Sequence, residues 1–145
     1  MAILTAPDDY QEVRETIDVT LDDVLLPDAT IARDAFAGAA EREVLARDPL
    51  AAGYPPGSDE AMSVRLACIY LTAARIAPSV PVLLSENVAP GISYARSAVD
   101  MDETAARLRS LAGRVFDSYL PSSTPSGPSV TVPFGFGVAS ASRGA

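Results

Sequence analysis

Apolar residues recur at intervals of three and four in several stretches of the chain, as they do on one face of an α-helix. The stretches predict helices over residues 8–17, 29–47, 59–76 and 100–119. The predicted buried faces are Tyr10, Val13 and Ile17 in the first, Ala32, Phe36, Ala40 and Val44 in the second, and Thr104, Ala105, Leu108, Leu111, Ala112, Val115, Phe116 and Tyr119 in the last. Residues 61–76 are apolar nearly all round, so we expect that helix at the centre of a bundle.

Residues that typically begin and end helices flank these stretches. Asp28 and Ser58 stand where N-cap residues are expected, and Asp100 opens a sequence that resembles a capping box. Pro49 and Pro121 follow the second and the last stretch, where a proline stops a helix. The predicted boundaries therefore have a local chemical reason as well as a pattern.

A β-hairpin is predicted between the third and the last helix, over about residues 82–98. Pro78 and Pro81 are expected to prevent the third helix from continuing. Apolar residues alternate on both sides of Pro90 and Gly91, which fit the two central positions of a type II turn.

The C-terminal residues, 121–145, predict an extended arm. Residues 121–129 are all Pro, Ser, Thr or Gly, a composition typical of a linker. Residues 130–138 then alternate as in a β-strand. Its apolar face would consist of Val130, Val132, Phe134, Phe136 and Val138. We expect such an arm to be anchored only on a partner, because exposed phenylalanines are unfavourable in water.

Composition argues against catalysis and against metal or cofactor binding. The chain of 145 residues has no histidine, so Ser-His and Cys-His nucleophiles and imidazole zinc ligands are excluded. Its one cysteine, Cys68, lies in an apolar run and is predicted to be buried. The acidic pairs at residues 8–9 and 22–23 point to different sides of any helix or strand, so we interpret them as solvated charges. We expect no enzyme.

The charge and the hydropathy pattern also argue against two classes of partner, membranes and tightly bound nucleic acid. The longest uncharged apolar run, residues 66–74, is far below the ~20 residues that span a bilayer, so we expect a soluble protein without a membrane partner. The formal net charge is −8 and all 11 basic residues are arginine. Such an acidic surface opposes tight binding of nucleic acid, which requires cationic side chains at the phosphates.

The order of these elements resembles the head-to-tail connector proteins (adaptor or head-completion proteins) of tailed bacteriophages and gene-transfer particles. The resemblance covers about residues 10–119. It rests on the segment VRETIDVTLDDVLLPDATI, the helices AFAGAAEREV, RLACIYLTAARI and ETAARLRSLAGRVF, and the hairpin SENVAPGISYA. The family has no catalytic motif, so the resemblance transfers no catalytic residue to this chain.

The fold expected from pattern and resemblance together is mainly α. It is a small helical bundle over residues 1–120 with the inserted hairpin, followed by the extended arm with its strand. The resemblance implies a structural virion protein of the neck, at the head-tail junction, assembled in the host cytoplasm. It would form a ring, commonly a dodecamer, that contacts the portal protein and stopper or tail-terminator proteins while DNA passes through without specific binding.

The candidate partner-binding residues are those of the arm and of the hairpin turn. They are Val130, Val132, Phe134, Phe136, Val138, Pro90 and Gly91. The arm would add a strand to a sheet of the portal or of a neighbouring subunit. An alternative is an acidic stand-alone regulatory protein or DNA mimic, which fits the net charge of −8 but leaves the apolar arm without a role.

Overall fold

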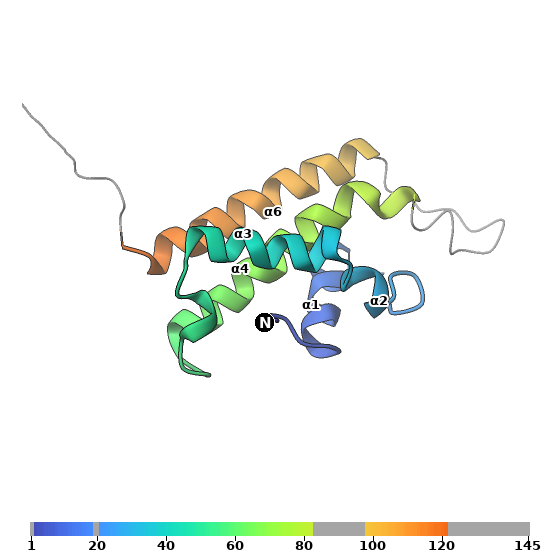
Figure 1. Ribbon diagram of the computed structural model, residues 1–145. Coiled ribbons are helices and arrows are strands. Elements are labelled where there is room, and N and C mark those ends of the chain that lie inside the picture. Colours follow the sequence, from blue (N-terminus) through green and yellow to red (C-terminus); the bar gives the residue numbers. More distant parts are fainter. Residues whose placement is uncertain (1, 19–20, 83–97, 122–145) are drawn as a thin grey trace, which may run out of the picture.

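Helix α4 (Asp59–Ile76) lies at the centre of a helical bundle (Figure 1). The computed structural model describes residues 2–18, 21–82 and 98–121. Helices α1 (Asp8–Ile17), α3 (Ala39–Arg47) and α6 (Ala98–Tyr119) all pack against α4. Helix α6 runs antiparallel to α4 and has the most extensive contact with it. The mainly helical fold and the central position of the third predicted helix are confirmed.

The core is built from the apolar faces of these four helices. In α4 it includes Ala67, Cys68 and Ile69, which are all but inaccessible to solvent. Leu4 and Leu26 add to it from the segments before α1 and after it. The buried position of the cysteine is confirmed, and burial, with a smaller contribution from the charge of Glu41, raises the pKa of its thiol to about 12. A thiol with such a pKa is unreactive.

The bounds of α1 and α4 agree with the sequence prediction. The hydroxyl of Ser58 accepts a hydrogen bond from the backbone N–H of Ala61 at 3.1 Å, so this residue is the N-cap of α4, as expected. Helix α6 ends at Tyr119, before Pro121, but it begins at Ala98. The predicted capping box is therefore wrong, because Asp100 already lies in the first turn of the helix.

The long helix predicted over residues 29–47 is interrupted. The chain forms α2 (Asp28–Ile31), an extended residue at Arg33 with ψ of 147°, the π-helix η1 (Asp34–Gly38), and then α3. Ile31 and Ala40 are both fully buried. They are separated by about two and a half helical turns, so one straight helix would place them on opposite faces. The interruption lets both side chains enter the core, and it leaves Ala32 exposed against the prediction.

The chain also remains helical beyond α4, where the prolines were expected to stop it. Pro78 lies at the start of the 3₁₀-helix η3 (Ala77–Ser79), a position where a missing N–H costs little. Residues 80–82 are helical as well, so Val82 does not begin a strand. The rest of the predicted hairpin, with Pro90 and Gly91, lies outside the described residues. The described ranges contain no β-strand.

Arg14 fixes the connection between α1 and α2 from inside the protein. Its side chain is 2 % exposed. Its Nε donates a hydrogen bond of 2.7 Å to the carbonyl oxygen of Leu26, and its Nη2 forms an ion pair with Asp28. Asp28 was expected to be the N-cap of a helix, but it is the first residue of α2 and Pro27 occupies the N-cap position. The carboxylate of Asp28 pairs with the buried guanidinium of Arg14 instead.

Candidate functional site

A buried carboxylate fixes the C-terminal end of α6. Asp48 follows α3 and is 2 % exposed. It accepts hydrogen bonds from the hydroxyls of Tyr119 at 2.8 Å and Tyr54 at 3.3 Å, and from the backbone N–H of Leu50 at 3.1 Å. The last turn of α6, the end of α3 and the loop over residues 48–58 are therefore joined where the chain leaves the bundle.

Aromatic contacts stiffen the same junction. The rings of Tyr54 and Tyr119 meet edge to face with centroids 6.3 Å apart, and Phe116 lies 6.1 Å from Tyr119. The guanidinium of Arg47 stands 4.9 Å from the centroid of the Phe116 ring, within cation–π range. Burial raises the pKa of the Tyr119 phenol, and the hydrogen bond to Asp48 and the charge of that carboxylate raise it further. The phenol therefore remains a neutral donor, and the last turn of α6 is held against the loop over residues 48–58.

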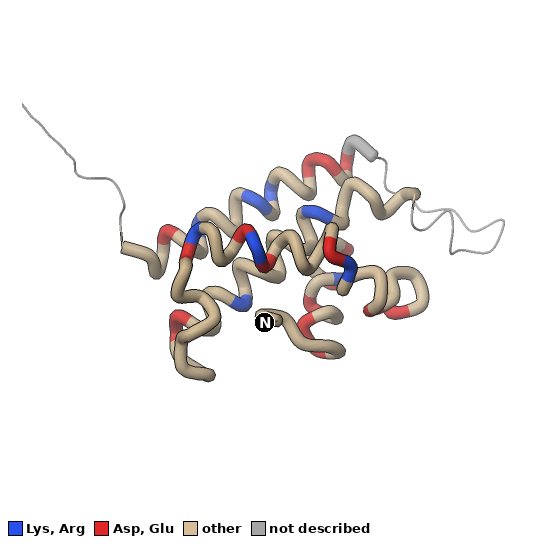
Figure 2. The backbone as a smooth tube through the Cα atoms, viewed as in Figure 1, with Lys and Arg blue, Asp and Glu red and all other residues tan. Residues whose placement is uncertain are grey.

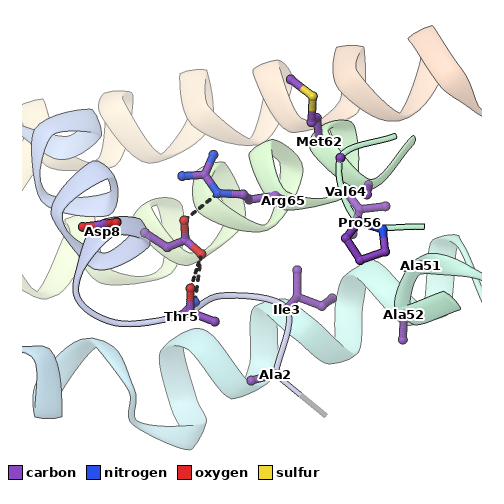
Figure 3. Close-up of a pocket in the computed structure, with 13 residues that line it drawn as sticks. Ala2, Ile3, Thr5, Asp8, Ala51, Ala52, Pro56, Met62, Val64 and Arg65 are labelled. Atoms are coloured by element: carbon purple, nitrogen blue, oxygen red, sulfur yellow. Dashed lines mark hydrogen bonds and ion pairs between the residues drawn. The ribbon is translucent and has the colours of Figure 1, made fainter. Parts of the chain in front are cut away.

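A groove of about 500 Å³ lies between the N-terminal segment, the loop after α3 and the first turns of α4 (Figure 3). Most of its lining is small or apolar. These residues are Ala2, Ile3, Ala51, Ala52, Pro56, Gly57, Ala61, Met62 and Val64. Its polar lining consists of Thr5, Asp8, Asp9 and Arg65. The side chain of Met62 is 61 % exposed, so a large flexible apolar group is available to a ligand.

The polar wall of the groove is held by ion pairs and hydrogen bonds. Asp9, which is 5 % exposed, accepts a hydrogen bond from the backbone N–H of Thr5 at 2.8 Å and pairs with Nε of Arg65 (Figure 3). Nη2 of the same guanidinium pairs with Glu12. Its Nη1 has no hydrogen-bond partner among the described residues, and it remains able to donate to a carbonyl oxygen.

The start of the N-terminal segment is tied to α3. The carboxylate of Glu41 accepts hydrogen bonds from the backbone N–H groups of Ile3 at 2.5 Å and Leu4 at 3.3 Å. Leu4 is buried, so the N-terminal segment is anchored on both sides. The groove is thus preformed, with an apolar lining and a polar edge. This arrangement suits an extended peptide with apolar side chains and free backbone carbonyls.

None of the residues that the sequence singled out for partner binding belongs to the part of the chain that the structure describes. Pro90 and Gly91 in the hairpin, and all five apolar residues of the arm, lie outside the described residues. The described chain does fix where both segments attach. The start of α6 packs beside η3, and the end of α6 lies beside the loop over residues 48–58 (Figure 1).

Sequence reasoning missed the groove. Its lining comes from parts of the chain that are far apart in sequence, and no periodic pattern joins them. Met62 gave only a weak signal in the sequence, because it is one of many apolar residues in a helix that was expected to be buried all round. Its exposure is seen only in the structure. Among the described residues, no group of three Asp, Glu or Cys side chains is arranged to hold a metal ion, and no helix could cross a membrane.

Comparison of the chain with protein-family models, with curated proteins and with solved structures found no significant match.

Proposed function

We propose that this protein is the subunit of an adaptor ring between the portal and the tail of a phage-like particle, as its sequence resemblance implies. Such a subunit must bind one partner on each side of the ring. It needs two binding segments, a rigid body that separates them, and no catalytic centre.

The observation that carries the proposal is the position of the two attachment points. Residues 83–97 connect η3 and residues 80–82 to α6, at one end of the antiparallel pair of α4 and α6 (Figure 1). Residues 122–145 follow α6 at the other end, beside Tyr54 and Asp48. The two segments predicted to bind partners therefore leave opposite ends of one bundle. This arrangement suits a protein that joins two structures.

Charge supports the passage of DNA better than its capture. Figure 2 shows acidic and basic residues interspersed along the helices. Several arginines are engaged in ion pairs, as where Glu43 of α3 pairs with Arg75 of α4 and Arg109 of α6. With a net charge of −8 per subunit, a ring would repel phosphate, so DNA could move through it without being held.

The test is co-sedimentation with heads that carry the portal of the same particle. We expect the full chain to be retained and a chain that ends after Leu120 to be lost. The double variant Phe134→Ser with Phe136→Ser should reproduce much of that loss, because the two rings are the largest apolar groups of the arm. Val24→Ser is the matched control, since Val24 is 70 % exposed on the bundle and belongs to neither segment.

Two outcomes would contradict the proposal in different ways. If the full chain stays monomeric in solution and does not sediment with heads, it is no adaptor, and binding to a DNA enzyme would favour the DNA-mimic alternative. If the truncated chain is retained as well as the full chain, the arm is not the joint, and the bundle or residues 83–97 must carry the attachment.

A further inference from the structure

We propose that in the free subunit the groove between the N-terminal segment and α4 binds residues 130–138 of the same chain. This inference goes beyond the adaptor function and does not depend on it, since it concerns one subunit without a portal. The sequence alone suggests an arm that is anchored only on a partner. The groove is a binding site for the arm on the helical bundle of the same chain.

The groove matches the chemistry of this segment. A volume of about 500 Å³ lies within the range of pockets that bury ligands with several apolar groups. The exposed thioether of Met62 can pack against an aromatic ring, and Ile3 and Pro56 line the same space. Phe134 and Phe136 are the only aromatic residues beyond α6. Each would bury ~150 to 250 Å² of surface on entering such a site.

The attachment point of the arm makes the site reachable. Tyr119 contacts Tyr54, and Tyr54 stands in the same loop as the groove residues Ala52 and Pro56. The nine residues 121–129, whose composition predicts a linker, could span up to ~28 Å if they were extended at ~3.1 Å per residue. The end of α6 contacts the same short loop that lines the groove. Residues 130–138 can therefore reach the groove of their own subunit.

Charge does not oppose this contact. All 19 acidic residues and 10 of the 11 arginines lie in residues 1–121, so that part has a net charge of −9 (10 − 19). Residues 122–145 contain only Arg143 as a charged side chain. An uncharged segment brings no carboxylate toward Asp8 and Asp9 at the edge of the groove. Its backbone carbonyls can accept a hydrogen bond from Nη1 of Arg65, which has no partner among the described residues.

The covalent link favours the same chain over a second copy. A segment tethered by a short flexible linker experiences an effective concentration of about the millimolar range. At lower protein concentrations, binding to its own groove therefore exceeds binding to a neighbour's groove. A partner that takes the arm must compete with this internal site.

The test uses the full chain with a nitroxide on a cysteine introduced by Ser140→Cys, next to the segment. Cys68 stays unlabelled because its side chain is fully buried. In ¹⁵N spectra we expect at least a twofold loss of amide signal for Ile3, Ala52 and Met62, independent of protein concentration, and none for Val24. Adding Phe134→Ser with Phe136→Ser should restore the signals.

Two further variants and a mixing experiment separate the possible outcomes. Met62→Asp should weaken the effect severalfold, whereas Val24→Asp, an equally drastic change at an exposed valine outside the groove, should not. A signal loss that appears only when labelled ¹⁴N chains are mixed with unlabelled ¹⁵N chains would show that a second copy is the occupant, and would overturn the proposal. No selective loss at the groove would overturn it as well. Neither result bears on portal binding.

Discussion

Asp48 shows how one residue can hold several segments together. Two donors from the loop that follows it and one from the end of α6 converge on its carboxylate, and solvent reaches almost none of it. Removing a buried acceptor leaves its donors without partners, which costs more than the hydrogen bonds themselves contribute. The carboxylate therefore helps to hold the end of α6 against the loop, together with the ring contact of Tyr54 and Tyr119.

We expect Asp48→Ala to lower the free energy of unfolding by about 1 to 3 kcal/mol, because the hydroxyls of Tyr54 and Tyr119 lose their acceptor. Chemical denaturation monitored by circular dichroism measures the change. Asp34→Ala is the control, since Asp34 forms an exposed ion pair with Arg42 and should leave the midpoint where it is. Equal midpoints for both variants would show that the Asp48 network adds no stability.

Tyr119 makes stability depend on pH at the alkaline end. Its pKa in the folded protein lies above the ordinary value of 10.0, first because it is buried and then because of Asp48. The unfolded chain therefore loses the phenolic proton first as pH rises, and the stabilisation present below pH 10 declines above it. Tyr119→Phe should make this decline shallower. Urea midpoints on both sides of that pH measure it, and an unchanged slope would contradict the assignment.

Helix α6 carries two leucines of the same predicted stripe with different burial. Leu108 is fully buried, whereas Leu111 is only partly buried. We expect Leu108→Ala to cost about 2 to 5 kcal/mol, as for a leucine replaced by a cavity. Leu111→Ala should cost less, roughly 1 kcal/mol, because part of its surface already faces water. Denaturation midpoints compare the two, and a larger loss for Leu111 would place the core on the other side of the helix.

The element scale also shows what the sequence can and cannot predict. The bounds of α1 and α4, and the end of α6, follow from local signals such as Ser58 and Pro121. The break at Arg33 has no such signal, because neither glycine nor proline stands there. It results from the need to bury both Ile31 and Ala40, and that need exists only in the packed bundle. The helical pattern of apolar residues continues through the break. The prediction therefore joined α2, η1 and α3 into one helix.

At the scale of the whole molecule, the features that matter for binding arise from contacts distant in sequence. The groove is formed by the N-terminal segment, the loop around Pro56 and the first turns of α4. Glu41 and Asp9 hold that segment in place, and the interpretation of Asp9 as a solvated charge is wrong, because its side chain is buried and paired with Arg65. Their hydrogen bonds to the backbone of residues 3–5 make both of them structural anchors. Periodicity identifies faces of single helices, but it contains no information on which segments meet.

The length of α6 has a consequence for any assembly that contains this chain. Its 22 residues span about 33 Å at 1.5 Å per residue, with one attachment point near each end. The helix thus acts as a ruler that sets the gap between whatever the two segments bind. One added turn would widen the gap by about 5.4 Å, and one added residue would also rotate the departing arm by about 100°. Insertions in this helix should therefore be far less tolerated than insertions in the loop around Gly53.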